Sequence, residues 1–571
     1  MAHSFRLLDT DPAAVRGLVS QLGIHPVTAR CMIARGIDEP ARATAYLNPR
    51  LSDLRAPVGM AGFERAVSRL CLAVSRGERV GVFGDYDVDG VTSAALMCWF
   101  LRRVGGTPVP RVARRGGGYG FGPQDASWFV QEGCTIVLTL DCGTSDVPAI
   151  LSLTERGIDT IVVDHHQVPE RKVHPAHALV NPHRPDSTYP FRGLASVGLC
   201  FFLAAAARTK LRDRGWFASR PEPDVRELLD LVAVGTIADL APLCEENRVL
   251  AALGLRELQA QRRAGWGALL RLAGVELDRP LDEVDIAWRI GPRLNAPGRL
   301  KDATPALDLL LAANPQEAAA HALSCEQANE ARRSLQEKTF HEALEDSLAR
   351  SGDPIVTVAR LGWHAGVVGI VAAKLVERLG KPAVVIAGDE STGEGRGSMR
   401  TTFGLNAYEA LASCKDLLVR FGGHAQAAGL TVVMDNVPTL RERLIQTAGT
   451  LLGEVTPSRT EVDAVVPLSV VDDALAQEIT RMAPFGPGNR EPILAAVRAR
   501  VRSSRRVGDG SHLKLLLECS EKGTRHAAIG FRMGPRDPGE GAVVDVAFSP
   551  LISYFRGERR VELKVHELSP S

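Results

Sequence analysis

The stretch Gly84-Asp85-Tyr86-Asp87-Val88-Asp89-Gly90 places three carboxylates within five residues. The apolar run 79–83 before it predicts a β-strand, and the run 91–100 after it predicts a helix. In an open α/β sheet, ligands bind at such strand-to-helix turns, outside the carboxyl ends of the strands. Because neighbouring carboxylates repel each other and hard divalent cations prefer oxygen ligands, this turn predicts a metal site.

Two other interpretations of the turn stay open at this point. An acidic turn that is simply solvated needs no ion. A calcium loop of the EF-hand type needs Glu at its twelfth position, which is Leu96 here, and the stretch follows a strand instead of a helix. Calcium is therefore disfavoured, and the solvated turn has to be weighed against the rest of the chain.

Three further motifs place acids and histidines at equivalent points. Asp141 follows the predicted strand 135–140, Asp164-His165-His166 follows the predicted strand 160–163, and Asp239 follows an apolar helix. The carboxyl ends of parallel strands meet at one edge of a sheet, so these side chains are expected to converge. A site rich in Asp with one or two His favours Mn²⁺ or Mg²⁺ over soft metals. Two such ions about 3.5–4 Å apart can activate water and stabilise the leaving oxygen of a phosphoester.

The composition limits the class of protein. The chain has 571 residues, of which 45% are hydrophobic and 24% charged, as in globular proteins of about three or four domains. The net charge of +1 means that nucleic-acid contacts must come from local basic patches. The N-terminus shows no secretory signal pattern, and no long apolar run predicts a membrane span. The ten scattered cysteines form no CxxC pair, which favours a reducing cytoplasm over a disulfide framework or a zinc site.

The pattern of runs predicts an α/β protein of five segments. Short apolar runs alternate with helical runs from about 78 to 200, which predicts βαβ units and a parallel sheet. Residues 313–350 contain few helix breakers and predict a long connecting helix. Five strand-like runs near the C-terminus fit a small barrel such as an OB-fold. The expected segments are 1–75, N-terminal and helical; 76–240, catalytic; 241–350, helical with the connector; 351–455, a second α/β domain; and 456–571, the OB-like barrel.

Taken together, the motifs resemble the DHH phosphoesterase superfamily and, within it, the RecJ family of bacterial single-stranded-DNA-specific exonucleases. The likeness to the superfamily rests on GDYDVDGVTSAA, DCG, VVDHH and GTIADLAPL. The likeness to the RecJ family rests on RVARRGGGYGFG, GPRLNAPGRL, WHAGVVGIVAAKL, GSMR, FGGHAQAAG and APFGPGNREP. The resemblance runs from about residue 75 to the C-terminus. It implies a DHH domain over 76–240, a DHHA1 domain over 351–455 and a nucleic-acid-binding OB-like domain over 456–571.

This resemblance implies a hydrolase with two Mn²⁺ or Mg²⁺ ions that degrades single-stranded DNA from the 5′ end to 5′-mononucleotides, in DNA repair and recombination. The metal ligands that it implies are Asp87, Asp89, Asp141, His165 and Asp239. Asp85 and His166 match catalytic positions near the metals and the scissile phosphate, together with Asp141 and His165. Many superfamily members carry His four residues before the first ligating Asp; this chain has Phe83 there, and Asp85 is expected to replace that His in part. The implied partners of an enzyme expected to be monomeric are a RecQ-type helicase and a single-strand-binding protein.

Residues in three loops are expected to hold the terminal nucleotide. Arg114 and Tyr119 belong to an Arg/Gly-rich loop that either grips a phosphate and stacks a base or is merely solvated. Ser398 and Arg400 are expected at a turn that forms an anion nest, and the resemblance assigns them, with Arg114, to the 5′ phosphate. Arg299 is expected in a polar loop that either contacts the strand or joins two domains.

Two further sets are expected to bind DNA along its length. Gly422-Gly423-His424 precedes a run that fits a helix, whose N-terminus favours a phosphate; a plain helix start capped by His is the alternative. Arg498, Arg500 and Arg502 alternate along a predicted strand and so share one face, with Arg505 close by. A charged outer face of a barrel is the alternative to a DNA-binding groove there.

Two rival functions are compatible with the same motifs. A phosphodiesterase of the superfamily that acts on short RNA or cyclic dinucleotides has the same metal site, but such chains usually end after the second domain, and this chain continues into a barrel. A catalytically inactive DNA-binding scaffold is disfavoured because the whole acidic set is present. The sequence therefore favours the single-stranded-DNA exonuclease.

Overall fold

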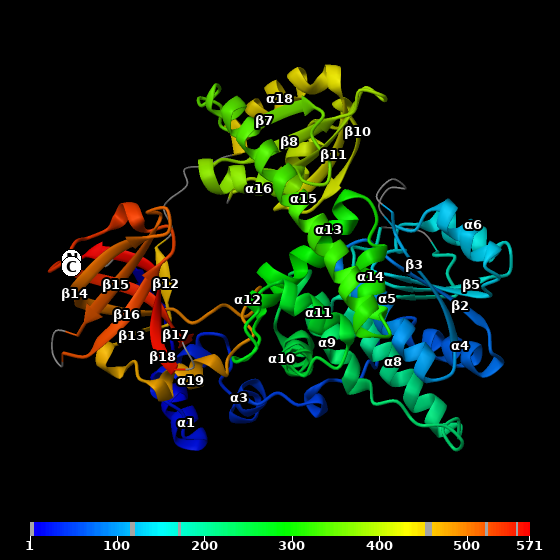
Figure 1. Cartoon of the computed structure of the whole chain (residues 1–571), viewed down its shortest axis with the longest axis horizontal. Helices are drawn as coiled ribbons and strands as arrows, with labels where there is room; N and C mark the ends of the chain where they lie inside the picture. The colour runs from blue at the N-terminus through cyan, green and yellow to red at the C-terminus, as the bar shows by residue number, and fades with distance from the viewer. Residues whose placement is uncertain are drawn as a thin grey trace.

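The computed structural model describes residues 5–114, 120–169, 173–402, 404–451, 459–519, 523–555 and 558–571. Three bodies surround a central helical region (Figure 1). A parallel-sheet domain lies on the right of the view, a second α/β domain at the top and a β-barrel on the left. Among the described helices, none is long and apolar enough to cross a membrane.

The first domain is built on a five-stranded parallel sheet in the order β3-β2-β4-β5-β6. Its strands are β2 (Arg79–Gly84), β3 (Thr107–Val112), β4 (Ile136–Leu140), β5 (Asp159–Val163) and β6 (Ala178–Val180). The predicted parallel topology is therefore confirmed, with strand boundaries that differ from the expected ones by at most one residue. Because β2, β4 and β5 are neighbours, the acids that follow them lie side by side at one edge of the sheet.

Helices cover both faces of this sheet. One face is buried by α4 (Phe63–Arg76), α5 (Val88–Arg103) and α8 (Ser196–Asp213), the other by α6 (Pro123–Gln131) and α7 (Val147–Thr154). Successive side chains of a strand point to opposite faces, and accordingly Val82 belongs to the first core and Phe83 to the second. The near-continuous apolar strands that this arrangement needs are what the sequence shows.

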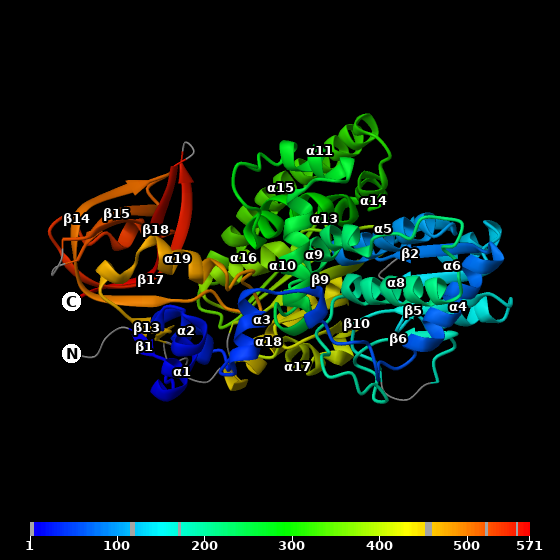
Figure 2. The same ribbon diagram turned by 90° about the horizontal axis from the view of Figure 1, so that it is seen from below.

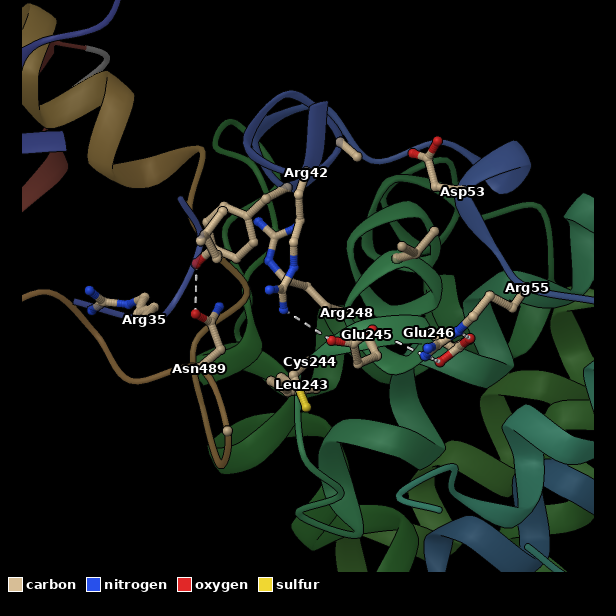
Figure 3. Close-up of a pocket in the computed structure, with 15 residues that line it drawn as sticks. Arg35, Arg42, Asp53, Arg55, Leu243, Cys244, Glu245, Glu246, Arg248 and Asn489 are labelled. Carbon is tan, nitrogen blue, oxygen red and sulfur yellow. Dashed lines mark hydrogen bonds and ion pairs between the residues drawn. The ribbon is translucent and has the colours of Figure 1, made fainter. Parts of the chain in front are cut away.

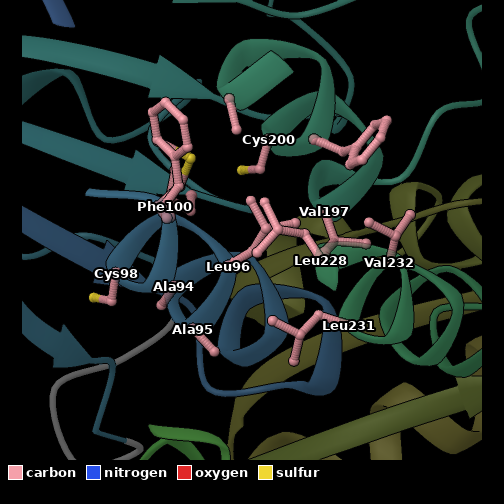
Figure 4. Packing of buried hydrophobic residues seen from close by; sticks show 14 of the residues in the cluster. Ala94, Ala95, Leu96, Cys98, Phe100, Val197, Cys200, Leu228, Leu231 and Val232 are labelled. Atoms are coloured by element: carbon pink, nitrogen blue, oxygen red, sulfur yellow. The ribbon is translucent and has the colours of Figure 1, made fainter. Parts of the chain in front are cut away.

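Helices α5, α8 and α9 (Leu229–Ala238) form one packed unit beside the sheet (Figure 4). Leu96 of α5, Val197 of α8 and Leu231 of α9 are fully buried in the same core. Burial of each such side chain stabilises the fold by about 1.5–3 kcal/mol. This packing fixes the N-terminus of α5, the N-terminus of α8 and the C-terminus of α9 relative to one another.

The central region is helical, and a long helix leads out of it. Its elements are η3 (Val225–Leu228), α10 (Glu245–Gln259), α11 (Ala264–Leu272), α12 (Glu283–Asp285), the π-helical turn η4 (Ile286–Ile290), α13 (Gly291–Leu300), α14 (Thr304–Leu311) and α15 (Pro315–Leu348). The predicted connecting helix is confirmed: α15 has 34 residues, about 51 Å at 1.5 Å per residue. Ala322 of α15 lies in the core of the first domain and Ala343 in that of the second α/β domain, so one helix sets their spacing.

The prediction that Arg299 lies in a loop is wrong, because it lies in α13. Pro297 and Gly298 favour a loop by propensity, but packing overrides them. A Cβ at Gly298 would lie 2.4 Å from the carbonyl oxygen of Tyr86, so glycine is needed there for close approach and not for a turn.

The second α/β domain has a mixed sheet in the order β10-β11-β9-β8-β7, in which only β7 and β8 are parallel. Its elements are β7 (Val356–Leu361), α16 (Val368–Leu379), β8 (Ala383–Gly388), β9 (Glu394–Arg400), α17 (Ala407–Ala412), η5 (Lys415–Leu417), β10 (Leu418–Gly423), β11 (Ala427–Val433), η6 (Met434–Asn436) and α18 (Val437–Leu451). The glycine-rich stretches 393–397 and 422–423, whose composition favours turns, lie largely in β9 and β10, although Gly393 ends the turn before β9 and Gly423 opens the turn after β10. A Cβ at Gly397 would lie 2.8 Å from the Ile386 side chain, so sheet packing requires glycine there. The stretch 435–460 reads as a loose linker in the sequence, but its first part forms α18.

The C-terminal domain is a closed β-barrel, which confirms the predicted OB-like fold. Its elements are β13 (Ala464–Val465), η7 (Leu468–Val470), α19 (Asp473–Thr480), β14 (Leu494–Val507), β15 (His512–Glu518), β16 (Arg525–Gly530), η8 (Gly534–Arg536), β17 (Val543–Phe555) and β18 (Glu558–Pro570). The strand order is β13-β14-β15-β16-β18-β17, and pairing of β14 with β17 closes the barrel. Closure leaves the long strand β14 without an open edge.

The beginning of the chain folds onto the barrel (Figure 2). β1 (Phe5–Leu7) pairs in parallel with β12 (Thr460–Val462). The helices that follow are α1 (Pro12–Leu22), α2 (Pro26–Ile33), α3 (Pro40–Leu47) and the turn η1 (Leu51–Asp53). Leu18, Met32 and Leu47 share a hydrophobic core with Leu475 and Phe548, whereas α4 belongs to the first domain. The first 75 residues are therefore divided between two cores.

A buried arginine joins the first domain to the barrel (Figure 3). Arg248 of α10 donates hydrogen bonds of 3.0–3.2 Å to the carbonyls of residues 481–483. Its guanidinium lies 3.8 Å from the ring centroid of Tyr46, whose hydroxyl donates to Asn489 Oδ1 at 2.7 Å. A cavity of about 220 Å³ lies beside this joint. The contacts tie α3, α10 and the segment before β14 together and so set the position of the barrel.

Candidate metal centre and DNA-binding surfaces

The carboxyl ends of β2 and β4 carry two buried aspartates. The Asp85 N–H donates to the Leu140 carbonyl at 3.2 Å, and the Asp141 N–H donates to the Val163 carbonyl at 3.0 Å. Both side chains are at most 1% exposed. Asp141 has φ +62°, a left-handed conformation that Asp tolerates better than most residues. The hydrogen bonds extend the sheet by one residue and hold these carboxylates at its edge.

Helix α5 supplies two more aspartates. Asp87 caps the helix, since its Oδ1 accepts a hydrogen bond from the Gly90 N–H at 3.1 Å. Asp89 is turned toward α8, where the N–H groups of Ser196 and Val197 donate to its two carboxylate oxygens at 2.7 and 2.9 Å. The Ser196 hydroxyl was not singled out by the sequence, because only the packing of α8 on α5 brings it here.

His165 lies at the centre of the acids. Its Nε2 is 3.2 Å from Asp141 Oδ1 and 3.9 Å from Asp89 Oδ2. The same nitrogen is 3.8 Å from Asp239 Oδ2, at the C-terminus of α9. Three groups of side chains have ligand atoms within 4.8 Å of one another: Asp141, His165 and His166; Asp89, His165 and Asp239; Asp85, Asp87 and Asp141. The structure thus brings all seven expected residues into one cluster.

Asp164 fixes the second histidine of the motif. Its Oδ1 lies 2.7 Å from His166 Nδ1, and its Oδ2 accepts a hydrogen bond from the Thr144 N–H at 3.1 Å. Burial lowers the pKa of His166, but the hydrogen bond and charge of Asp164 outweigh burial and raise it to about 9. Burial and the neighbouring His166 lower the pKa of His165 to about 4, which leaves its imidazole neutral. One histidine is therefore a cation and the other is in the form that binds metals.

The electrostatics of the cluster fit divalent cations. Burial raises the pKa of Asp141 and of Asp85 well above the usual range, and repulsion from Asp87 adds to it. The same two causes raise the pKa of Asp89 to about 7, and burial followed by repulsion from Asp89 raises that of Asp239 to about 9. Buried Asp141 Oδ2 makes no hydrogen bond within the described part of the chain. Cations would neutralise these carboxylates and use the open oxygen, so the residues present fit a two-metal site.

Phe83 stands where many DHH proteins carry His, and it is a core residue here. The ring is fully buried and lies edge-on to Phe121, with centroids 5.0 Å apart, and to Phe129 at 6.4 Å. A polar imidazole in this aromatic cluster would need a hydrogen-bond partner. Position 83 therefore contributes packing, and the oxygen of Asp85 is the nearer source of a ligand.

Ser398 and Arg400 lie on β9, so the prediction of a turn there is wrong. Arg400 Nη1 donates to Ser398 Oγ at 2.5 Å. A Cβ at Gly369 would lie 3.0 Å from Arg400 Nη2 and 3.3 Å from Ser398 Oγ, which places the first turn of α16 against both. Burial and then the charge of Arg299 lower the pKa of Arg400. Two guanidinium groups beside a helix N-terminus favour an anion.

A cavity of about 230 Å³ lies between the end of α9 and helices α13 and α15. Its lining includes Ala238 and Leu240, the neighbours of Asp239, together with Arg299 and Arg332. Sequence reasoning missed Arg332, because α15 reads only as a connector. Arg332 donates to two amide side chains of its own helix, and burial followed by the charge of Arg299 lowers its pKa. The cavity thus has a basic lining and lies next to the end of the helix that carries Asp239.

Arg114 lies at the end of β3 and is mostly exposed. Its Nε is 3.3 Å from Asp302 Oδ2, and the two residues form an isolated β-bridge. Asp302 follows α13, so Arg114 lies beside the helix that carries Arg299. The neighbouring Arg111 is engaged elsewhere, with its guanidinium 4.6 Å from the ring centroid of Trp128. Tyr119 lies outside the described residues.

Comparison with known proteins decides the family. The DHH family N-terminal domain matches residues 79–236, the DHHA1 domain 352–450 and the RecJ OB domain 462–567. The single-stranded-DNA-specific exonuclease RecJ of Escherichia coli is 33% identical over 94% of this chain and 98% of its own. The chain belongs to the RecJ family. RecJ of Bacillus subtilis is 34% identical over 98% of this chain and 70% of its own.

Solved RecJ structures have the same architecture. RecJ from Thermus thermophilus in complex with Mn²⁺ superposes with a TM-score of 0.82 and 28% identity, over 99% of this chain and 79% of that one. A RecJ exonuclease bound to manganese gives a TM-score of 0.59 and 32% identity, over 70% of this chain and 96% of that one. The arrangement of three bodies around the helical region is therefore that of RecJ.

In this RecJ-family chain, Gly422-Gly423-His424 leads into a hairpin and not into a helix. β10 ends at Gly423 and β11 begins at Ala427, and the His424 N–H donates to the Ala427 carbonyl at 2.8 Å. Gly423 has φ +143°, and a Cβ there would lie 2.5 Å from the Ala427 carbonyl oxygen, so the tight turn requires glycine. Burial, and charges that include His424, lower the pKa of His183. The hairpin tip therefore lies near the DHH domain.

The RecJ OB domain carries its arginines on the outside of β14. Arg500 pairs with Glu518 and Arg505 pairs with Lys514 across the ladder to β15. Positions 514 and 518 are four residues apart on one strand, so they share a face, and their partners share it too. The register shift between Val501 and Ser503 is what keeps Arg505 on that face.

A second irregularity precedes these residues. Arg498 has φ +56° at a register shift in the pairing of β14 with β17, and it is exposed, as are Arg500 and Arg502. Arg502 Nη2 lies 2.5 Å from Glu518 Oε2, so its charge is already paired. All four arginines are exposed, but Arg498 and Arg502 lie at register shifts, and the four differ in the charge that they offer to a phosphate.

Proposed function

We propose that this chain is an exonuclease that degrades single-stranded DNA from the 5′ end and releases 5′-mononucleotides. Its relatives are named single-stranded-DNA-specific exonucleases. The observation that carries the proposal is the cluster of aspartates and histidines at the edge of the parallel sheet, close to a cavity that Arg299 and Arg332 line. A phosphate held at the arginines would direct the end of a strand toward the acids.

The metal ligands are Asp87, Asp89, Asp141, His165 and Asp239. Two divalent cations, Mn²⁺ or Mg²⁺, supply activation of a water molecule and stabilisation of the departing oxygen when they are bound. Solved RecJ structures that resemble this chain hold Mn²⁺ or Mg²⁺. Asp141 and His165 each belong to two of the three candidate ligand groups, and Asp141, whose carboxylate has two oxygens, would be the residue that serves both ions.

His166 and Asp85 complete the catalytic group. His166 is held by Asp164 and is a cation at neutral pH, so it can donate a hydrogen bond to a phosphate oxygen. Asp85 joins Asp87 and Asp141 in the third ligand group. Its carboxylate takes over, in part, the role of the histidine that is Phe83 in this chain.

The polarity of degradation comes from recognition of the terminal phosphate. Arg114, Ser398 and Arg400 bind the 5′ phosphate, and Arg299 contributes charge beside them. The strand then continues over further contacts: Tyr119, the hairpin residues Gly422, Gly423 and His424, and Arg498, Arg500, Arg502 and Arg505 of the barrel. We expect the spacing set by α15 to admit one strand and to exclude a duplex.

An enzyme of this kind acts on DNA that other proteins have opened. A RecQ-type helicase would supply the unwound strand, and a single-strand-binding protein would keep it extended. The reaction would serve DNA repair and recombination in the cytoplasm, with the protein acting as a monomer.

The test uses four end-labelled substrates in the presence of Mn²⁺: single-stranded DNA labelled at the 5′ or the 3′ end, blunt duplex DNA, and a short RNA. The proposal expects immediate release of the 5′ label as a mononucleotide and progressive shortening of the 3′-labelled strand. Duplex DNA should resist. Release of the 3′ label first, or preference for the short RNA, would contradict the proposal.

A further inference from the structure

Ser196, the first residue of α8, is fully buried against the metal cluster. Its hydroxyl donates to Asp141 Oδ1 at 3.1 Å. Its N–H donates to Asp89 Oδ2 at 2.7 Å, and the next N–H, that of Val197, donates to Asp89 Oδ1 at 2.9 Å. One residue thus contacts two of the carboxylates that the proposed function assigns to the metal ions.

The hydroxyl of Ser196 does not cap its own helix. The N-cap of α8 is Ala195, which has no side-chain oxygen to accept a hydrogen bond from the first turn. Here the backbone groups of that turn are used by Asp89, which comes from α5, and the hydroxyl donates to Asp141, which comes from the end of β4. The hydroxyl therefore orients a group outside its own helix.

The hydrogen bond from Ser196 makes the two carboxylate oxygens of Asp141 different: one is held by the protein and the other is open to a metal ion. Oδ1 accepts from Ser196 and lies 3.2 Å from His165 Nε2, whereas Oδ2 is buried without a hydrogen bond in the described part of the chain. A carboxylate at the end of a strand can rotate about its terminal bond, because that torsion is broad. A donor on Oδ1 restricts this rotation and keeps Oδ2 directed into the cluster.

We propose that Ser196 is a positioning residue that orients Asp141 for metal binding through its hydroxyl, while the α8 N-terminus holds Asp89. This inference rests on the ligand set of the proposed function. Partners that hydrogen-bond to metal ligands orient those ligands, and their loss costs about 10–100-fold in metal affinity or activity. The ordering of Asp141 before the ions bind lowers the entropy that binding would otherwise cost.

The test measures Mn²⁺ binding to the full-length protein without DNA, by electron paramagnetic resonance titration of free Mn²⁺. We expect S196A to bind Mn²⁺ about tenfold more weakly than the unaltered chain, the low end of that range. S196T, which keeps the hydroxyl, should restore most of the affinity. Should S196A lose its fold on melting, S196C replaces it, since a thiol fills the same place but donates only a weak hydrogen bond.

A matched control removes a buried hydroxyl that touches no carboxylate. Ser93 is fully buried on α5, and its hydroxyl makes no hydrogen bond within the described part of the chain. S93A should bind Mn²⁺ within twofold of the unaltered chain. An equal loss in S93A and S196A, or affinity within twofold in S196A, would overturn the inference. D141N distinguishes failure of this inference from failure of the proposed function. If D141N keeps full Mn²⁺ affinity, the proposed ligand set is itself wrong.

Discussion

Replacement of Asp141 by Asn tests the shared ligand with little disturbance of the backbone. Asp141 has φ +62°, where most side chains cost roughly 1–2 kcal/mol but Asn is tolerated. Asn also keeps an oxygen for the hydrogen bond from Ser196. Alanine would add strain and remove that contact, so its effect would mix stability with chemistry.

The expected loss of turnover is large. Asp141 takes part in two of the three ligand groups, so its neutralisation weakens both ion positions at once. Stabilisation of transition-state charge by bound metals amounts to several kcal/mol. A loss of about 4 kcal/mol corresponds to roughly 10³-fold in rate. DNA binding should stay within about threefold, because the arginines that contact phosphate lie elsewhere.

The assay is single-turnover cleavage of a 5′-phosphorylated poly-dT strand in saturating Mn²⁺, beside strand binding without metal. The metal-free D141N protein should melt at or above the temperature of the unaltered chain. Burial, and then repulsion from Asp87, disfavour the Asp141 charge, and the amide carries none. Cleavage within tenfold of the unaltered chain would refute the assignment of Asp141 as the shared ligand.

Three further predictions follow from the same structure. R400A should slow cleavage of a 5′-phosphorylated strand about 10- to 150-fold more than it slows cleavage of a 5′-hydroxyl strand, since a charge-assisted hydrogen bond contributes roughly 1.5–3 kcal/mol. Equal losses of cleavage rate on the two strands would show that Arg400 does not recognise the terminal phosphate. The double variant R500Q/R505Q should flatten the slope of log affinity for single-stranded DNA against log salt by about 1.4, at about 0.7 per phosphate contact. R502Q should change this slope less, because Arg502 is already paired with Glu518. An unchanged slope in the double variant would exclude the barrel face from DNA binding. Burial raises the pKa of Glu283 to about 7, so its proton stabilises the fold fully below pH 4.5 and this stability is lost as the pH rises through 7. In urea at pH 8, E283Q should therefore be more stable than the unaltered chain by at most about 3 kcal/mol, with no difference at pH 4.5. Equal stability of the two proteins at both pH values would contradict the raised pKa.

The metal cluster was predictable because its residues follow strands. Apolar runs show where β2, β4 and β5 end, and parallel strands bring their carboxyl ends together whatever the details of packing. Asp87 and Asp141 could therefore be placed from the sequence alone. Ser196 could not, because its approach to Asp141 depends on how α8 packs against α5, and a serine within an apolar run carries no signal of that contact.

Glycine-rich segments were the least predictable part. Gly397 favours a turn by propensity, yet it lies in a strand where the Ile386 side chain leaves no room for a Cβ. Residues 1–75 were predicted to be helical, but no local pattern predicts that the first of these helices pack onto a barrel more than 400 residues away. A truncation near residue 465 would consequently expose the core around Met32, so substitutions on β14 test the barrel more cleanly.

The most direct measurement of the central claim is anomalous scattering from crystals of this protein soaked in Mn²⁺. The account predicts two peaks about 3.5–4 Å apart, one on each side of Asp141, within reach of the side chains of Asp87, Asp89, His165 and Asp239. A single peak away from Asp141, or none at an Mn²⁺ concentration that supports cleavage, would contradict it.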